Sequence, residues 1–230
     1  MNKNLQELVA ACGVDTEVEN IVVSDLRIDS RKVKKGDVFL AVQGQMGHGL
    51  DFAEQAIAQG AVAVITDKEL AGKEKNNQQS VPIFCVDKLS TMLGDLAHQF
   101  YGEPSEKLSV LAVTGTNGKT SVAWFLMHAL NQSGKKAAYI GTLGAGFVDG
   151  MASLINTTPS VIDLHRLLAE FVAQGATHAC IEVSSHALDQ GRIDGIFVNQ
   201  ALFTNLSRDH LDYHLNMENY ADAKYKLFDL

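Results

Sequence analysis

Apolar positions in the first hundred residues switch between helical and strand spacing, which is typical of a small α/β unit. Leu5, Leu8 and Val9 recur on one helix face, and Gly13 can end that helix. Further on, the pattern predicts a turn and strand within 33–42, a helix over 52–59, strands over 61–66 and 81–86, and an amphipathic helix over 89–101.

The second half of the chain alternates strands and helices more regularly. Proline at 159 suits the first turn of a helix that starts at Thr158-Pro159 and runs to about Ala173. A strand–helix–strand succession predicts a parallel sheet that is covered on both faces. The expected strands are 108–113, 137–140, 178–183 and 197–204, and the other expected helix is about 120–132.

Gly102 and Pro104 separate the two patterns. We therefore expect an N-terminal α/β domain over 1–88, a connecting helix and linker over 89–105, and a parallel-sheet domain over 106–230. The last residues, KYKLFDL, lie inside a predicted helix, and so few parallel strands would leave a sheet edge exposed. The sequence thus predicts an α/β protein with an incomplete second domain, the front part of a longer protein.

Charge and cysteine content narrow the function classes. The 230 residues hold 19 Lys and Arg against 27 Asp and Glu, and the net charge of −8 argues against general nucleic-acid binding. Cys12, Cys85 and Cys180 are odd in number and far apart, which argues against a disulfide framework and favours a reducing cytoplasm. The sequence contains no apolar stretch of signal-peptide or membrane-spanning length.

The sharpest chemical signal is a glycine loop, TGTNGKTS at 114–121, between a predicted strand and a predicted helix. Its glycines would let the backbone wrap a phosphate, and the helix N-terminus would point amides at it. Lys119 would approach the β- and γ-phosphates, and the Thr120 hydroxyl suits Mg²⁺. Val113 stands where the common phosphate loop has glycine, so this loop is a variant. The alternative is a plain glycine turn with a solvent-exposed lysine.

A second polar segment, EVSSHALDQGR at 182–192, follows a predicted strand, at the edge where open α/β sheets bind ligands. Glu182 could hold Mg²⁺, and Arg192 could clamp an anionic substrate. A salt bridge for Glu182 and a helix cap by Ser184 or Ser185 are the plainer alternatives. The adjacent Ser-Ser-His does not predict a hydrolase triad, whose members meet in space.

Two other segments have weaker chemical signals. In NLSRDHLDYH at 205–214, Asp209 or His210 could reach a metal, or the histidines could simply lie in a polar surface loop. In NTTP at 156–159, the hydroxyls could bind a ligand, or Thr158 could cap a helix.

Plain structural roles are favoured elsewhere. Composition alone makes Lys224 a solvated helix residue. The segment Asp29-Ser30-Arg31 predicts a turn with a salt bridge, and helical spacing makes Trp124 and Phe125 core residues.

Taken together, the motifs resemble the Mur ligases, in particular the type that adds a diamino acid, MurE. The resemblance covers essentially the whole chain, and EVSSHAL with the following Gln190 and Arg192 is its most specific part, because other Mur ligases share the loop variant but not that string. The motifs are TGTNGKT, NTTP, EVSSHALDQGR, NLSRDHLDYH and YADAKYKLF, with DSR and GDVFLAVQG upstream.

The resemblance implies an ATP-dependent amide ligase of peptidoglycan synthesis. The D-Glu carboxylate of UDP-MurNAc-L-Ala-D-Glu would become an acyl phosphate, which a diamino acid, meso-diaminopimelate or L-lysine, would attack. A carboxylate is a poor acyl donor until it is phosphorylated, so positioning and charge neutralisation would supply most of the catalysis.

The resemblance also assigns residue roles. Lys119, Lys224 and His210 would be catalytic. ATP would be bound by Gly115, Thr116, Asn117, Gly118, Lys119, Thr120 and Ser121. Mg²⁺ ions would be held by Thr120, Glu182, His210 and Lys224, the last as a carbamate. The UDP-MurNAc-dipeptide would be bound by Asn156, Thr157, Thr158, Ser184, Gln190 and Arg192, and its uridine end by Ile28, Ser30, Gln45, Met46 and Gly47.

The family resemblance further implies a small UDP-binding domain, a central ATPase domain and a Rossmann-like third domain, of which the last is absent from this sequence. Because that domain would carry the diamino-acid site, we expect the chain alone to be inactive. General likeness to proteobacterial members favours diaminopimelate over lysine. We expect a cytoplasmic monomer that binds no nucleic acid and inserts into no membrane.

Two other function classes remain open. A phosphotransferase or GTPase would need its own acceptor motif, and no NKxD string is present. A non-catalytic nucleotide-binding fragment is the other alternative, although the intact Lys119, Glu182 and Lys224 argue against a decayed enzyme.

Overall fold

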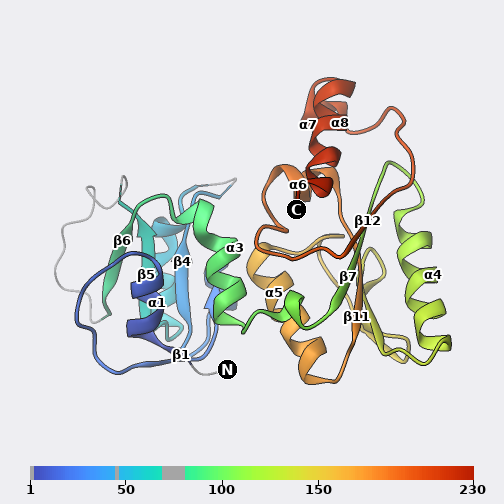
Figure 1. Ribbon diagram of the computed structural model, residues 1–230. Coiled ribbons are helices and arrows are strands. Elements are labelled where there is room, and N and C mark those ends of the chain that lie inside the picture. Colours follow the sequence, from blue (N-terminus) through green and yellow to red (C-terminus); the bar gives the residue numbers. More distant parts are fainter. Residues whose placement is uncertain (1–2, 45–46, 69–80) are drawn as a thin grey trace. The chain divides into compact units, whose positions relative to one another are not determined.

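The computed structural model describes residues 3–44, 47–68 and 81–230. It divides the chain into two compact units, residues 1–100 and 101–230, which we describe separately (Figure 1). The division falls directly before Gly102 and Pro104. The helix that we expected to connect two domains therefore belongs to the first unit.

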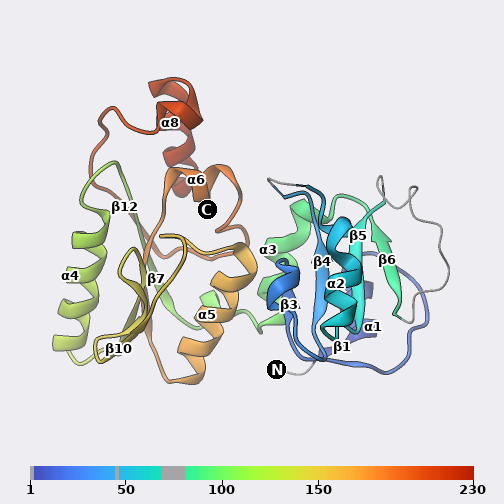
Figure 2. The same cartoon turned by 180° about the vertical axis from the view of Figure 1, so that it is seen from behind.

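The first unit is a four-stranded parallel sheet with helices on both sides. Figures 1 and 2 show α1 and α3 on one side and α2 on the other. In sheet order the strands are β3 (Leu26–Arg27), β4 (Val38–Ala41), β5 (Ala63–Asp67) and β6 (Ile83–Val86). The other elements are α1 (Leu5–Ala11), α2 (Ala53–Ala58), α3 (Leu89–Phe100), the antiparallel pair β1 (Lys3–Asn4) and β2 (Val22–Val23), and the 3-10 turns η1 (Ser30–Lys32) and η2 (Gly49–Phe52).

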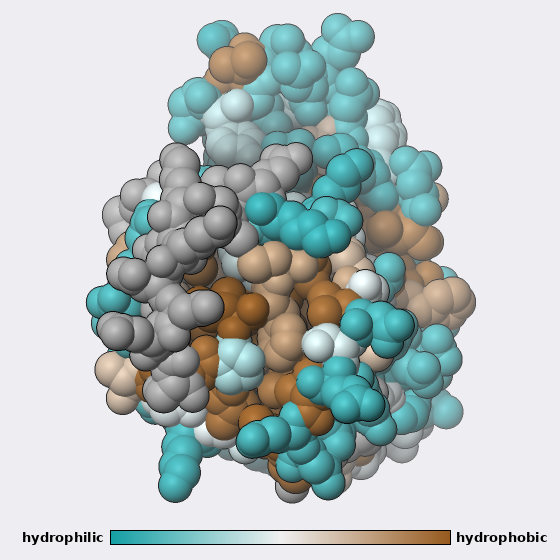
Figure 3. Space-filling view, turned by 90° about the vertical axis from the view of Figure 1, so that its left-hand side faces the viewer, coloured by the Kyte–Doolittle hydropathy of each residue, from teal (hydrophilic) through white to brown (hydrophobic). Residues whose placement is uncertain are grey.

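Strands β4 and β5 are buried almost throughout, and alternate residues of each face the core under α2. Phe39 and Ala41 of β4 pack with Val64 of β5 and with Ala53 and Ala56 of α2. The outer strand β6 is only half-buried over its first three residues. Figure 3, which views the unit from the β6 side, shows apolar side chains framed by hydrophilic ones on this face.

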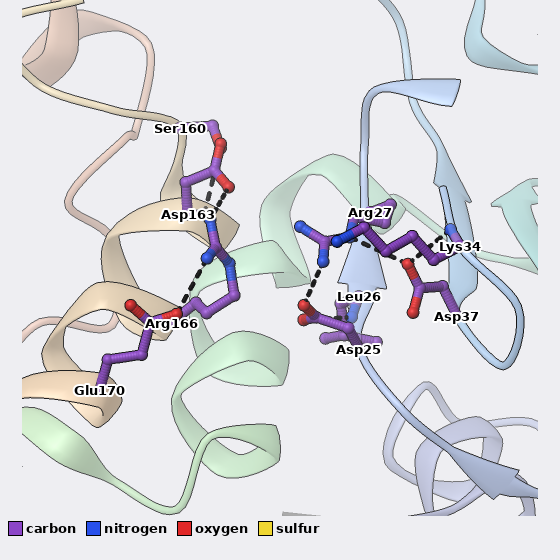
Figure 4. Close-up of polar contacts among 9 residues, drawn as sticks. All are labelled: Asp25, Leu26, Arg27, Lys34, Asp37, Ser160, Asp163, Arg166 and Glu170. Carbon is purple, nitrogen blue, oxygen red and sulfur yellow. Dashed lines mark hydrogen bonds and ion pairs between the residues drawn. The ribbon is translucent and has the colours of Figure 1, made fainter. Parts of the chain in front are cut away.

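Two groups of ion pairs fix local structure, one in each unit (Figure 4). In the first unit Arg27 donates to Asp37 at 3.0 Å and to Asp25 at 2.5 Å, and Asp37 also accepts from the Lys34 amide at 2.9 Å. These bonds tie β3 to the turn that precedes β4. In the second unit Arg166 pairs with residues three positions before it and four after it on helix α5 (Val161–Ala173), a spacing that brings helix side chains together.

The second unit is a six-stranded sheet in the order β10-β9-β8-β11-β7-β12. Successive residues of β7 face opposite sides, so Val110 and Ala112 join the core under α5, whereas Leu111 and Val113 join the core under α4. The parallel strands are β7 (Ser109–Thr114), β8 (Ala137–Gly141), β11 (His178–Glu182) and β12 (Gln200–Phe203). The main helices are α4 (Lys119–Gln132), α5, α6 (Ser185–Asp189), α7 (Leu211–His214) and α8 (Met217–Tyr225).

The sheet is mixed, not wholly parallel as we expected. After β8 the chain forms an antiparallel hairpin, β9 (Gly144–Phe147) and β10 (Gly150–Ala152). Helix α5 also starts later than predicted, because Ser160 caps it by accepting from the Asp163 amide at 3.2 Å. Thr158 and Pro159 precede the cap. Within the described part of the chain, no helix has the length and apolar character needed to cross a membrane.

Candidate functional site

The polar segments found in the sequence meet at one edge of the second sheet. Strands β7, β8, β11 and β12 run parallel, so their carboxyl ends share that edge. The glycine loop follows β7, the segment with Glu182 ends β11, and the segment with His210 follows β12. This is the edge at which open α/β sheets bind ligands.

The glycine loop is braced by the segment that follows β12. The Thr116 amide donates to the Asn205 carbonyl at 2.8 Å, and the Thr204 hydroxyl donates to the Asn117 carbonyl at 2.6 Å. Gly115 has φ +138°, and a Cβ there would collide with the Thr204 hydroxyl. The loop therefore requires glycine at this position for both reasons.

Lys119 opens helix α4 and folds back over the loop. Its ammonium donates to the carbonyls of Gly115 and Thr116, both at 2.8 Å. Burial lowers its pKa, an effect that the charges of Glu182 and Asp209 oppose. The lysine is thus half-buried and held over the loop, and its ammonium is not simply extended into solvent.

Glu182 is fully buried at the end of β11 and is held by hydroxyl and amide groups. Its Oε2 accepts from the Thr120 hydroxyl at 2.8 Å, and its Oε1 accepts from the Thr142 amide at 2.9 Å. The Tyr139 hydroxyl also donates to Oε1. Gly141 lies so close that a Cβ would collide with this carboxylate. The carboxylate is therefore fixed with one oxygen toward the glycine loop.

The oxygen atoms of Thr120 and Glu182 suit a hard cation such as Mg²⁺, which prefers oxygen ligands. His210 lies on the exposed side of the site, with its ring centroid 6.0 Å from that of Tyr220. No cluster of three or more His, Cys, Asp or Glu side chains with metal-binding geometry occurs among the residues that the structure describes. Of the predicted metal ligands, Thr120 and Glu182 are joined by a direct hydrogen bond.

Lys224 is buried, contrary to the solvated helix residue expected from composition alone. Only 1% of it is exposed, and its amine donates to the Gly115 carbonyl at 2.8 Å. Burial, with the nearby charge of Lys119, lowers its pKa to about 8. Lys226, two residues on, instead forms a partly exposed ion pair with Asp189 at 3.0 Å.

Hydrogen bonds also join several of the predicted substrate-binding residues. Arg192 donates through Nη1 to the Thr158 carbonyl at 3.0 Å and through Nε to Gln190 Oε1 at 3.0 Å. The Thr158 hydroxyl accepts from the Ser184 amide at 3.2 Å and donates to the Glu182 carbonyl at 2.8 Å.

The plainer helix-cap interpretation is confirmed for Ser184, whose hydroxyl accepts from the Ala187 amide at 3.1 Å. The helix-cap interpretation is wrong for Thr158, whose hydroxyl bonds to the Glu182 carbonyl at the end of β11 and to the Ser184 amide after it. The hydroxyls of Thr157 and Thr142 lie 3.2 Å apart, and Asn156 is exposed beside them in sequence. The Thr142 hydroxyl also donates to Glu182 Oε2 at 3.3 Å, so the Thr157 hydroxyl is linked to the carboxylate through Thr142.

In the first unit, Ser30 is buried and donates to Gln55 at 2.8 Å, and Ile28 is half-buried. Arg31 pairs with Asp29 at 2.9 Å, which confirms the predicted turn with a salt bridge. Gly47 accepts a bond from the Gly44 amide at 2.9 Å. The predicted residues Gln45 and Met46 lie outside the described residues.

Comparison with protein families identifies the chain. Residues 113–230 match the family described as Mur ligase middle domain, and residues 22–101 match that described as Mur ligase family, catalytic domain. The chain belongs to the Mur ligase family.

Individual relatives agree with this assignment. The UDP-N-acetylmuramoyl-L-alanyl-D-glutamate--2,6-diaminopimelate ligase of Xylella fastidiosa is 45% identical over 214 residues, or 92% of this chain and 42% of the relative. The Vibrio vulnificus protein of the same name is 42% identical over 227 residues, or 98% of this chain and 46% of the relative. The chain thus spans less than half the length of the curated relatives it matches.

Solved structures show the same Mur ligase architecture. A solved UDP-N-acetylmuramoyl-L-alanyl-D-glutamate--2,6-diaminopimelate ligase superposes with a TM-score of 0.77 at 31% identity, over 99% of this chain and 45% of that one. MurF from Acinetobacter baumannii, at 18% identity, reaches 0.66 over 100% of this chain and 46% of its own, which shows a shared fold.

Sequence reasoning on this Mur ligase missed the residues that hold the predicted ones in place. Tyr139 and Thr142 contact Glu182 but lie near the end of an ordinary apolar strand, and Tyr213 contacts Gln190 from a different helix. The one available signal for the first two was that they flank the carboxyl end of a predicted parallel strand. Phe125, expected in the core, is 68% exposed, whereas Trp124 does pack against the core under α4.

Proposed function

We propose that this chain carries the ATP-binding and UDP-MurNAc-L-Ala-D-Glu-binding parts of a ligase that adds meso-diaminopimelate to the D-Glu carboxylate, through an acyl phosphate, in peptidoglycan synthesis. The names of its relatives, which are diaminopimelate ligases acting on UDP-N-acetylmuramoyl-L-alanyl-D-glutamate, support these substrates. The observation that carries the proposal is the 2.8 Å hydrogen bond between the Thr120 hydroxyl and Glu182 Oε2. It joins the start of helix α4 to the carboxyl end of β11, beside the glycine loop.

ATP would bind with its phosphates on residues 115–121. The amides at the start of α4 and the ammonium of Lys119 would hold the β- and γ-phosphates, because a helix N-terminus favours anions. Thr120 and Glu182 would hold Mg²⁺, which neutralises phosphate charge when bound. Lys119 would exchange its two carbonyl partners for phosphate oxygens, which form stronger charge-assisted hydrogen bonds.

The UDP-MurNAc-dipeptide would bind beside this site. Arg192 would bind an anionic group of the dipeptide, since a guanidinium matches a carboxylate in geometry and charge. We assign the same substrate portion to Gln190 and Ser184, with the hydroxyl-rich residues Asn156, Thr157 and Thr158. The uridine end is assigned to the first unit, at Ile28, Ser30 and residues 45–47.

We further propose that Lys224 is carbamylated in the active enzyme. The neutral amine would attack CO₂, form an N–C bond and release a proton, which leaves an anionic carbamate. Its lowered pKa, about 8, supports this step because only the neutral amine reacts. The carbamate would offer a second Mg²⁺ the oxygen ligand that an ammonium lacks, and His210 is also assigned to Mg²⁺ binding.

The proposal is tested by calorimetry on the purified chain. We expect the chain to bind Mg-ATP and UDP-MurNAc-L-Ala-D-Glu independently. Lys119→Ala should lower the affinity for Mg-ATP and leave the affinity for UDP-MurNAc-L-Ala-D-Glu unchanged. Absence of binding of either ligand to the folded chain would contradict the proposal.

Choice of diamino acid is tested with the complete reading frame from which the chain comes. Supplied with ATP and the dipeptide precursor, it should release phosphate with meso-diaminopimelate and not with L-lysine. Preference for L-lysine would favour the lysine-adding alternative. We place the reaction in the cytoplasm and the enzyme as a monomer, the former supported by the three free thiols.

A further inference from the structure

Tyr213, in the four-residue helix α7, links two segments that are more than twenty residues apart in sequence. Its hydroxyl lies 3.0 Å from Asp189 Oδ2, at the end of helix α6, and 3.2 Å from Gln190 Nε2. Its ring also packs against His186, with the centroids 4.3 Å apart. Tyr213 therefore contacts the segment that carries Gln190 and Arg192 both by hydrogen bonds and by its ring.

The direction of each hydrogen bond in this group is fixed by chemistry. Asp189 pairs with the Lys226 ammonium at 3.0 Å, which lowers the pKa of the carboxyl and keeps it an acceptor. The Tyr213 hydroxyl must therefore donate its proton to Asp189. The phenol oxygen is then free to accept, so the NH₂ group of Gln190, and not its oxygen, must face Tyr213.

The orientation of the Gln190 amide determines the position of Arg192. With its nitrogen on Tyr213, the amide presents its oxygen to Arg192, which donates from Nε at 3.0 Å and from Nη2 at 2.6 Å. A guanidinium has no acceptor, so a flipped amide would lose both bonds. The remaining Arg192 contact, Nη1 to the Thr158 carbonyl at 3.0 Å, ties the group back to the edge of the sheet.

We propose that Tyr213 is a positioning residue that orients the Gln190 amide and, through it, holds Arg192 in place for an anionic group of the UDP-MurNAc-dipeptide. The inference rests on the proposed function. It adds that affinity for this substrate depends on a hydroxyl that does not touch the substrate. The effect is confined to the dipeptide, because the Tyr213 hydroxyl bonds to Asp189 and Gln190, and through Gln190 reaches Arg192, and not the glycine loop.

The test uses calorimetry of the chain with UDP-MurNAc-L-Ala-D-Glu and, separately, with Mg-ATP. Tyr213→Phe removes one hydroxyl and keeps the ring, so we expect the Kd for the dipeptide precursor to rise about fivefold and the Kd for Mg-ATP to stay within twofold. The matched control is Tyr225→Phe, since Tyr225 is 56% exposed and stacks on Phe203. That variant should leave both constants unchanged.

A double-mutant cycle distinguishes positioning from general loosening of the fold. If Tyr213 acts through Gln190, Tyr213→Phe should change the Kd less than twofold when introduced into Gln190→Ala. An equal effect in both backgrounds, an unchanged dipeptide Kd, or a parallel loss of Mg-ATP affinity would overturn the inference. Failure of the proposed function has a different signature, in which the unsubstituted chain itself does not bind the dipeptide precursor.

Discussion

Lys224 donates a hydrogen bond to the carbonyl oxygen of Gly115 at 2.8 Å, across 109 positions of sequence. Lys119 donates to the same oxygen, also at 2.8 Å. Two lysines therefore converge on one carbonyl at the base of the glycine loop. Their mutual repulsion is one reason why the Lys224 pKa is low, after burial itself.

Lys224 should make stability depend on pH in a specific window. Its pKa is about 8 in the folded chain against an ordinary 10.5, so between these values this group binds more protons in the unfolded state, and its contribution to the free energy of unfolding rises with pH. Lys224→Met removes this gain, which is at most about 3 kcal/mol. Urea titrations at pH 7 and pH 10 measure it. The change in the free energy of unfolding between the two pH values should be the same in Lys226→Met as in the unsubstituted chain and less positive in Lys224→Met. An equal change in Lys224→Met would contradict the assignment.

Lys119→Ala should weaken Mg-ATP binding more than tenfold, which corresponds to more than about 1.4 kcal/mol. The reason is the loss of the ammonium at the start of helix α4 that is folded over the glycine loop. Equilibrium dialysis with labelled ATP measures the change. Lys68→Ala, which removes an exposed ion pair with Asp87 in the first unit, is the matched control and should bind normally. Equal affinities for the two variants would exclude the role of Lys119.

Gly141→Ala should destabilise the second unit, because the new methyl group collides with the Glu182 carboxylate and the Tyr139 hydroxyl. Overpacking of this kind costs about 1–3 kcal/mol. Gly150→Ala is the control, since a Cβ there has open space. Denaturant unfolding measures both, and Mn²⁺ titration followed by electron paramagnetic resonance should show weaker metal binding in Gly141→Ala alone. If Gly141→Ala and Gly150→Ala were equally stable, the Glu182 carboxylate would be able to move away from the new methyl group.

Ser160→Ala should lower the free energy of unfolding by about 1 kcal/mol, because it removes the cap of helix α5. Urea unfolding followed by circular dichroism measures the loss. Ser133→Ala is a suitable comparison, because Ser133 directly follows helix α4 and its exposed hydroxyl donates to the Leu130 carbonyl. We expect this substitution to lower the free energy of unfolding less than Ser160→Ala does. If Ser160→Ala lowered the free energy of unfolding no more than Ser133→Ala does, the Ser160 cap would contribute little to stability.

The main features of the fold could be predicted because they depend on local patterns. Continuous apolar runs predicted the four parallel strands of the second sheet, and parallel pairing then required their polar ends to meet at one edge. The hairpin of β9 and β10 was missed because glycine is unfavourable in strands by propensity. Gly144 and Gly146 are needed there, since a Cβ on either would collide with the backbone of β10.

The site could be predicted only in part for a similar reason. The glycine loop depends on adjacent residues and was evident in the sequence. The burial of Lys224 depends on a carbonyl 109 positions away, so composition gave the opposite expectation. Tyr139 and Tyr213 form their contacts through folding alone, and no local pattern distinguishes them from ordinary strand and helix residues.

The long-range bracing of the glycine loop also sets an order of events during synthesis on the ribosome. All elements of the first unit lie before residue 101, so that unit can fold while the rest of the chain is still being made. The loop at 115–121 is made before the residues that brace it, because Thr204 and Lys224 contact loop residues that lie 87 and 109 positions earlier in the sequence. The geometry of the phosphate-binding loop therefore cannot be completed until residue 224 has been made, well after all elements of the first unit are available.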